Sequence, residues 1–317
     1  MRFSLWLYPY GRWGSLEAMA GGARRAEELG FDSISISDHI VCPTGPDGVG
    51  VTPVWHDFFV LSTYIAGHTS RVRLVGCLVL PYRRLLPMAK QIASVDVASG
   101  GRFTLVACVG WLRQEFDMLG VPFEERGDIT DEYLRAMKIL WTEERPSFEG
   151  RYCRFSDIVF EPKCRQKPHV PIWIGGAGRR AESRLAQFGD GWMPMGGDLT
   201  DGLRATVDGL KERAAEAGRD PDALQFRYTL SIGEPETALR SISHSIRVDE
   251  PAVARLGGAG SPSLAGSSGS ADEVAETISR FDEAGFTELC LSFAWETPEQ
   301  YLERIEWFAS SVMPYVR

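Results

Sequence analysis

The chain has 317 residues, of which 44% are hydrophobic and 24% charged, and its formal net charge is −9. This acidic balance argues against a nucleic-acid surface and a polybasic membrane patch, both of which need clustered positive charge. No stretch approaches the roughly 18 uninterrupted apolar residues of a membrane span. Pro9 and Gly11 interrupt the short apolar start, unlike a signal peptide. We therefore predict a cytoplasmic protein that binds small molecules.

Apolar runs of strand length alternate with segments of helical periodicity along the whole chain. Ser15 can cap the first predicted helix and Gly30 can end it. In chain order, the predicted strands are 3–8, 33–37, 72–80, 103–109, 171–174, 191–194, 226–232 and 288–293. The predicted helices are 15–29, 86–98, 128–141, 179–188, 200–217, 270–284 and 298–312.

These elements favour an α/β fold with a closed barrel. Strands rich in Val, Ile and Leu on both faces are typical of a parallel sheet covered by helices, and eight strands in a chain of this length favour a (β/α)8 TIM barrel. A doubly wound open sheet is the alternative, and it is disfavoured because no strand is followed by a GxGxxG turn. We predict that residues 1–317 form a single (β/α)8-barrel domain.

Two insertions exceed the strand–helix repeat, after the fourth and seventh strands. Residues 142–170 contain a stretch, 148–155, that is compatible with a small hairpin. Residues 233–269 are rich in Gly and Ser and leave the barrel at the end where catalytic residues are expected. Two interpretations stay open for this second insertion: a mobile lid over the active site, and a surface loop without a role.

The cysteines and histidines do not predict a metal site. The six cysteines form no CxxC pair, and the five histidines show no HExxH or HxH spacing. Cys77, Cys108 and Cys290 lie inside predicted strands, so we expect buried free thiols, which fit a reducing compartment.

Catalytic residues of such barrels lie at the C-terminal ends of the strands. Here these positions hold many aromatic residues and glycines and few ionisable groups, which suits a flat ring system. His39 follows Asp38 at the end of the second strand. An isolated histidine is more often structural, but this position favours catalysis, because a neutral histidine can give or take a proton near pH 7.

The run Gly175-Gly176-Ala177-Gly178 lies between the fifth predicted strand and the next helix. Backbone amides at a helix N-terminus bind phosphate, and glycines allow the phosphate to approach. Arg179 and Arg180 could add charge or could be solvated residues of the first helical turn. An ordinary strand-to-helix turn remains the alternative.

Seven segments, taken in order and spacing, resemble the luciferase-like monooxygenase family, in particular its branch that uses the deazaflavin coenzyme F-420. Asp38-His39 resembles that branch, whereas many flavin monooxygenases of the family have a Glu-His pair at this place. The resemblance implies a (β/α)8 barrel that binds a flavin-like ring at the strand ends, and a homodimer formed through outer helices. The segments are 26–40, 69–74, 86–105, 109–127, 148–155, 171–178 and 189–194.

The resemblance also implies roles for individual residues. His39 would be catalytic. A bulge with a non-proline cis peptide often backs the ring in this family, and the matching stretch here is Gly76-Cys77-Leu78. The implied cofactor-binding residues are Asp38, Gly76, Cys77, Leu78, Gly110, Gln114, Gly175, Gly176, Met195 and Gly196, and the implied substrate-binding residues are Tyr8, Tyr10, Trp111 and Trp295.

Two departures limit what the resemblance implies. Some deazaflavin dehydrogenases have a glutamate where this chain has Trp111, and some have a tryptophan soon after the histidine, where this chain continues with residues 40–43, IVCP. The sugar-phosphate dehydrogenase activity of some relatives is therefore not expected here.

Three functions remain as hypotheses. The first is an oxidoreductase that moves a hydride between coenzyme F-420 and a small organic substrate, with His39 assisting proton transfer. The second is a two-component monooxygenase that uses FMN and oxygen and depends on a flavin reductase. The third is a binding protein without catalysis on the same fold.

Overall fold

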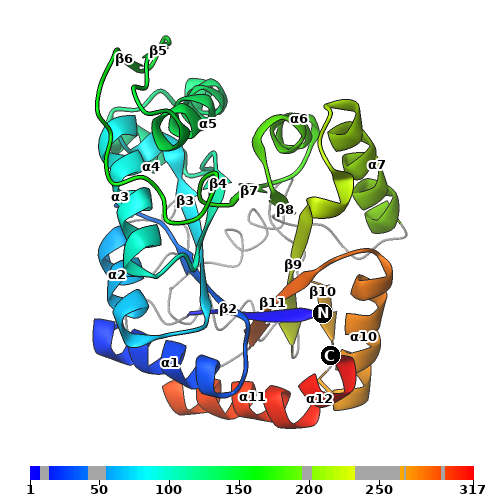
Figure 1. Ribbon diagram of the computed structural model, residues 1–317. Helices are drawn as coiled ribbons and strands as arrows, with labels where there is room; N and C mark the ends of the chain where they lie inside the picture. The colour runs from blue at the N-terminus through cyan, green and yellow to red at the C-terminus, as the bar shows by residue number, and fades with distance from the viewer. Residues whose placement is uncertain (8–13, 42–54, 195–201, 233–264, 268, 294–296) are drawn as a thin grey trace.

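The computed structural model describes residues 1–7, 14–41, 55–194, 202–232, 265–267, 269–293 and 297–317. Eight parallel strands pair into a barrel, which closes through the pairing of β8 with β9. The predicted (β/α)8 architecture is confirmed (Figure 1). The barrel strands are β1 Arg2–Trp6, β2 Ser33–Ser37, β3 Arg73–Val79, β4 Phe103–Cys108, β7 Ile172–Gly175, β8 Gly191–Met193, β9 Gln225–Ile232 and β11 Glu288–Phe293.

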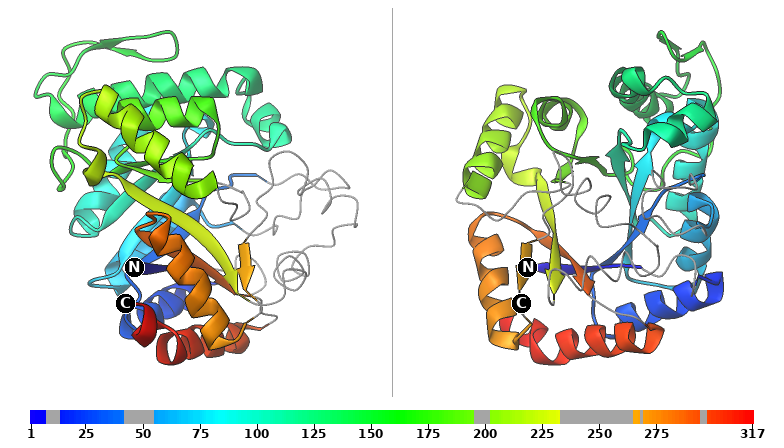
Figure 2. Two further views of the ribbon diagram at one scale, coloured as in Figure 1. Left: turned by 90° about the vertical axis from the view of Figure 1, so that its right-hand side faces the viewer. Right: turned by 180° about the vertical axis from the view of Figure 1, so that it is seen from behind.

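Helices surround the barrel on its outer side (Figures 1 and 2). Their positions follow the prediction within a few residues, except for α2, α4 and the short α12, which the sequence patterns did not predict. The helices are α1 Leu16–Glu28, α2 Phe58–His68, α3 Leu85–Ala98, α4 Arg113–Leu119, α5 Arg126–Thr142, α6 Arg179–Phe188, α7 Gly202–Glu216, α10 Ala271–Glu283, α11 Pro298–Ser311 and α12 Met313–Val316, with short 3-10 turns at η1 Leu80–Tyr82, η2 Phe123–Glu125 and η3 Pro221–Ala223.

Polar side chains at the helix starts explain where several helices begin. The Ser15 hydroxyl accepts from the Ala18 amide at 3.1 Å, and Asp57 caps α2 through the amides of residues 59 and 60. Ser270 and Glu273 form a reciprocal capping box at α10. Each cap provides an acceptor for amides that have no partner within the helix.

The predicted hairpin at 148–155 is confirmed. Strands β5 Phe148–Glu149 and β6 Arg154–Phe155 pair antiparallel, away from the barrel. Buried Glu132 of α5 accepts the amides of Arg151, Tyr152 and Cys153 at 2.7–2.8 Å. These contacts attach the hairpin turn to α5.

The second insertion contains a strand of the sheet. Strand β10, Ala265–Ser267, pairs parallel with residues 230–232 of β9, beyond the point where β8 has ended. This part of the segment 233–269 was predicted without secondary structure, and that prediction is wrong for residues 265–267. The possible lid falls mainly on residues 233–264 and 268, which lie outside the described residues.

The barrel interior is lined by aromatic, aliphatic and sulfur-containing side chains. They include Trp6, Val75, Cys77, Val106, Trp173, Met193 and Cys290. The prediction of buried free thiols is confirmed for Cys77 and Cys290, while Cys108 is free and half-buried. No helix in the described part of the chain is long and apolar enough to cross a membrane.

Both chain ends lie at the N-terminal end of the barrel strands (Figure 2). Arg317 donates to the Gly30 carbonyl at 2.6 Å and to Asp32 at 2.9 Å. The opposite end, where the strands finish, carries the predicted site.

Candidate active site

His39 is held by a buried glutamate that the sequence did not identify. His39 follows β2, and its Nδ1 lies 2.8 Å from Oε2 of Glu115 on α4. The other oxygen, Oε1, accepts the backbone amides of Ile40 at 2.6 Å and Val41 at 3.2 Å. The hydroxyl of Tyr82 donates to Oε2 at 2.8 Å. Glu115 is completely buried, and His39 retains 12% side-chain exposure.

The hydrogen-bond donors around Glu115 favour its ionised form. Burial raises the pKa of a carboxyl group, but the hydrogen bonds from His39, the Ile40 amide and Tyr82 outweigh it and lower the pKa of Glu115. Burial and the negative charge of Glu115 raise the pKa of Tyr82, which therefore stays a donor. An ionised carboxylate only accepts, so Nδ1 of His39 carries a hydrogen. Nε2 is then the nitrogen left to exchange a proton with a substrate.

Asp38 ties the end of β2 to the end of β3. Its carboxylate accepts a two-pronged contact from Arg83, at 2.6 and 2.8 Å, and the Val79 amide at 3.1 Å. Burial raises the pKa of Asp38, and the contacts from Arg83 oppose that rise. Two parallel charge-assisted bonds give a rigid geometry. Because Asp38 directly precedes His39, these contacts also fix the backbone position of His39. A direct contact between Asp38 and a cofactor stays a prediction.

Two tryptophans flank the imidazole of His39. The ring centroid of Trp55 lies 4.7 Å away, and that of Trp111 lies 6.3 Å away in an edge arrangement. Trp111 is 52% exposed, so its face is open to a ligand. The other predicted substrate-binding residues, Tyr8, Tyr10 and Trp295, lie outside the described residues.

The predicted ring-backing stretch on β3 divides between two environments. The Cys77 side chain belongs to the interior cluster of the barrel, whereas Leu78 packs in the outer core. A Cβ on Gly76 would come within 2.4 Å of the Phe58 ring, so this glycine allows α2 to approach the sheet. The cis peptide bonds of the described residues both precede prolines, at 162 and 168, so the non-proline cis bond suggested for 76–78 is not found.

The end of β4 forms a tight turn beside the thiols. Gly110 has a φ of +81° and its carbonyl accepts from Arg126 at 3.2 Å. A side chain at this position would strain the backbone and meet Phe116. Gln114 lies exposed on α4, one residue before Glu115. Gly110 therefore lies on the turn, and Gln114 on the helix, that together position Glu115 beside His39.

The glycine run before α6 has open space beside it, and its role in binding a phosphate stays a prediction. Gly176 and Gly178 have φ values of +105° and +88°, and a Cβ at either would meet no atom within 4 Å. Gly178 begins α6 without a side-chain cap, which leaves first-turn amides to a ligand. Gly175 is instead closely packed, because a Cβ at this position would lie 2.8 Å from the Cys108 sulfur. Met195 and Gly196 lie outside the described residues.

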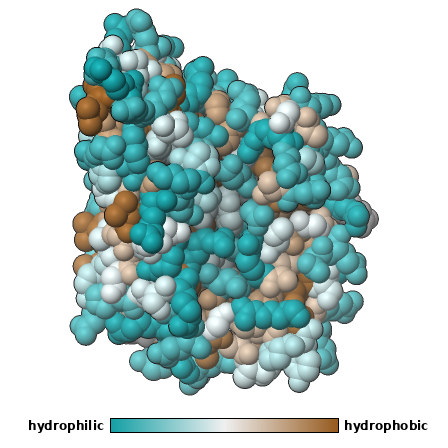
Figure 3. Space-filling model, viewed as in Figure 1, coloured by the Kyte–Doolittle hydropathy of each residue, from teal (hydrophilic) through white to brown (hydrophobic). Residues whose placement is uncertain are grey.

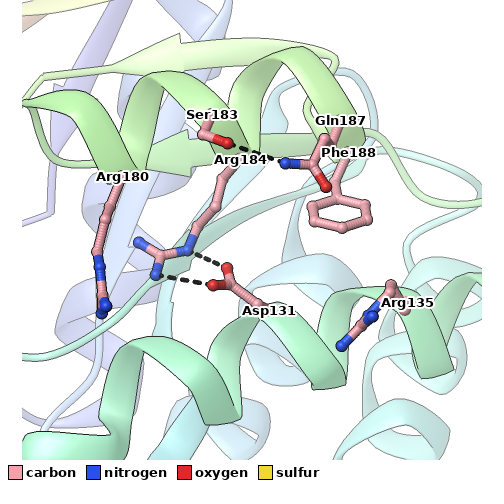
Figure 4. A pocket seen from close by; sticks show the side chains of 7 residues that line it. All are labelled: Asp131, Arg135, Arg180, Ser183, Arg184, Gln187 and Phe188. Carbon is pink, nitrogen blue, oxygen red and sulfur yellow. Dashed lines mark hydrogen bonds and ion pairs between the residues drawn. The ribbon is translucent and has the colours of Figure 1, made fainter.

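The side chain of Arg180 contacts α5 and not this glycine run. Figure 4 shows the Arg180 side chain extending from α6 toward α5. Its guanidinium lies 3.6 Å from the carboxylate of Asp128 on α5. Beside it, Arg184 pairs with Asp131 across a surface pocket of about 190 Å³. Of the two arginines, exposed Arg179 is the one left beside the glycine run.

Comparison with known proteins decides the family. The family model of the luciferase-like monooxygenases matches residues 2–313. The chain belongs to this family. The relatives matched by sequence include FMNH2-dependent monooxygenases, and the protein is an oxidoreductase of the luciferase-like type.

Individual known proteins resemble this luciferase-like chain in sequence or in fold. A FMNH2-dependent dimethylsulfone monooxygenase of Pseudomonas putida is 28% identical over 292 residues, which are 89% of this chain and 77% of the relative. An F-420-dependent secondary alcohol dehydrogenase, solved with an F-420–acetone adduct, has a TM-score of 0.77 at 20% identity and covers 100% of this chain and 99% of its own. A monooxygenase from Streptomyces bottropensis has a TM-score of 0.77 at 24% identity, with 100% of both chains covered. These two structures show the fold alone.

The residue that sequence reasoning missed in this luciferase-like site is Glu115, together with its partner Tyr82. A signal for Glu115 was present, because residues 112, 115, 116 and 119 share one face of a helix. A carboxylate on an otherwise apolar face predicts a buried partner. Nothing in the sequence indicated that this partner is His39, which lies 76 residues earlier.

Proposed function

We propose that this luciferase-like protein transfers a hydride between coenzyme F-420 and a small organic substrate, with His39 moving the accompanying proton. The observation that carries the proposal is the contact of His39 with ionised Glu115. Oxidising an alcohol or reducing a carbonyl moves a hydride at carbon and a proton at oxygen. His39 Nε2 can accept or donate that proton, because Glu115 holds the opposite nitrogen in its protonated form.

The coenzyme supplies the hydride-carrying ring, and the chain supplies its position. Amides at the start of α6, with the open glycines 176 and 178, would hold the phosphate. Cys77 and Gly110, at the ends of β3 and β4, would lie beneath and beside the ring. Trp55 and Trp111 would border the substrate and exclude water from it, which strengthens hydrogen bonds at His39.

A second candidate is an FMN-dependent monooxygenase that receives reduced flavin from a separate reductase. The favouring observation is the match to the dimethylsulfone monooxygenase over most of both chains. The glycine run suits the phosphate of either coenzyme, and His39 could donate a hydrogen bond to an oxygen-derived group instead of moving a substrate proton. The two proposals differ in their need for oxygen.

The test is turnover with each coenzyme in the absence and presence of oxygen. The purified protein is mixed anaerobically with F-420 and a panel of secondary alcohols and aldehydes, and coenzyme reduction is followed by absorbance. We expect reduction without oxygen, and its loss in His39→Ala. Product formed only with reduced FMN and oxygen would reject hydride transfer and establish the second candidate.

A further inference from the structure

A polar cavity opens at the N-terminal end of the barrel, opposite the predicted active site. Its volume is about 520 Å³, and its lining includes Arg2, Arg73, Gln166, Lys167, His169 and Gln225. Arg2, Arg73 and Gln225 are the first residues of β1, β3 and β9, which places the cavity at the strand starts. Figure 3 looks onto this end, where hydrophilic residues predominate around the middle of the face.

Positive charge exceeds negative charge at the base of this cavity. Three guanidinium groups surround the one buried carboxylate of Glu288: Arg2 at 3.6 Å, Arg73 at 3.7 Å and Arg227 at 3.5 Å. All three distances are ion-pair distances longer than an ordinary hydrogen bond, and the three cations share this one carboxylate. Ser33 donates to Glu288 at 2.8 Å and occupies one of its oxygens.

Other groups around the cavity do not cancel this excess. The acidic lining residue Asp190 is already paired with Arg219 at 3.2 Å and accepts the Ile172 amide at 2.9 Å. Asp96, which lies behind the lining, accepts from Gln166 at 2.7 Å. Lys167 adds a further exposed ammonium group at the rim.

Two observations indicate that one carboxylate does not fully balance the three arginines. Nε of Arg2 and Oε2 of Glu288 lie 3.6 Å apart, and neither atom has a hydrogen-bond partner within the described part of the chain. Burial lowers the pKa of Arg73, the charges of Arg2 and Arg227 add to this shift, and the charges of Glu288 and Asp32 oppose it. The side chains of Arg2 and Arg73 are each 33% exposed, so an anion in the cavity could contact both and relieve the repulsion between the three cations.

We propose that this cavity is a second ligand site, which binds a phosphate-bearing small molecule between Arg2, Arg73 and Lys167. Planar guanidinium groups match phosphate oxygens with paired hydrogen bonds, and an ammonium adds a point charge. The cavity volume lies within the range of small-molecule sites, which accommodates a nucleoside monophosphate. The site is separated from the coenzyme cradle by the length of the barrel.

The test measures phosphate binding to the full chain loaded with whichever coenzyme it binds, so that the phosphate cradle at α6 is filled. Inorganic phosphate, AMP and citrate are titrated by calorimetry into the wild type, Arg73→Gln and Lys167→Gln. Arg24→Gln removes the same charge from an exposed position on α1 and is the matched control. If Arg73→Gln disturbs the fold, Lys167→Gln still tests the site, because Lys167 is exposed and its substitution should leave the fold intact.

We expect binding of one phosphate or AMP per chain, weakened at least tenfold by Arg73→Gln and by Lys167→Gln and unchanged in Arg24→Gln. Tighter binding of AMP identifies a phosphate monoester as the ligand, and tighter binding of inorganic phosphate identifies the free ion. Binding of citrate alone, binding that does not respond to Arg73 and Lys167, or no binding below millimolar concentration would overturn the proposal. Binding lost in Gly176→Ala and retained in Arg73→Gln would place the anion at α6 instead.

Discussion

Replacing Glu115 with glutamine tests how His39 is set for proton transfer. Glu115 accepts four hydrogen bonds: from the amides of Ile40 and Val41, the hydroxyl of Tyr82 and Nδ1 of His39. Glutamine keeps one acceptor oxygen and presents an NH2 group to the other two donors. If the oxygen faces the amides, the NH2 group faces His39, and the imidazole relieves the clash by moving its hydrogen to Nε2.

The structure gives two magnitudes for this substitution. Hydrogen bonds to a buried charge contribute about 1.5–3 kcal/mol each, and part of the set survives in glutamine, so we expect a stability loss of about 2–4 kcal/mol. A positioned acid or base accelerates a reaction roughly 10²- to 10⁴-fold. With the hydrogen on the wrong nitrogen, we expect turnover to fall by roughly 10²-fold or more, which is about 3 kcal/mol of barrier.

The assay combines turnover with nitrogen-15 NMR of the His39 ring, which reports the nitrogen that carries the hydrogen. Glu132→Gln is the matched control, because Glu132 is also a buried helix glutamate that accepts backbone amides but lies at the hairpin. We expect both variants to lose stability and only Glu115→Gln to lose turnover. Equal turnover in the two variants, with the Nδ1 hydrogen retained, would refute the reasoning.

Three further changes have defined outcomes. His39→Ala should leave coenzyme binding intact and slow turnover roughly 10²- to 10⁴-fold; unchanged turnover would remove His39 from the mechanism. Gly176→Ala and Gly218→Ala should each cost about 1 kcal/mol in unfolding experiments, because both positions have positive φ, but only Gly176→Ala should weaken coenzyme affinity. Burial opposes ionisation of Glu27, but the amides of residues 70–72 outweigh it and lower the pKa of Glu27 to about 2. The stability that ionised Glu27 contributes is therefore complete above about pH 4.5 and should be lost as the pH falls from about 4.5 to about 2. The free energy of unfolding, measured with urea across that pH range, should fall less steeply with decreasing pH in Glu27→Gln than in the wild type. The same pH dependence in both proteins would reject this prediction.

Local patterns predicted most of the barrel because each strand–helix unit carries its own signals. Ser33–Ser37, Arg179–Phe188 and Glu288–Phe293 match the predicted bounds. Helix α2 was missed because its sequence, FFVLSTYIAGH, is apolar around most of its circumference and shows no polar face. Strand β10 was missed because Ala265–Ser267 is stabilised by its pairing with β9 and has no strand propensity of its own.

The site was predicted at the level of strand ends, and its contacts were not. The position of His39 after β2 followed from the barrel rule, because catalytic side chains gather at one end. The contacts of Glu115 with His39 and of Asp38 with Arg83 join residues 76 and 45 positions apart, and only the closed fold brings them together. Charged residues inside apolar strands, Arg227 and Glu288, were the sequence signal for the polar cavity at the other end.

The most direct test of the central claim is a competition between the two coenzymes for the purified, coenzyme-free chain under anaerobic conditions. Binding of F-420 and of FMN is followed by fluorescence, in the wild type and in Gly176→Ala. The account predicts that F-420 binds at micromolar concentration and at least tenfold more tightly than FMN, and that Gly176→Ala weakens it. Tighter binding of FMN, or binding of neither coenzyme, would contradict the account.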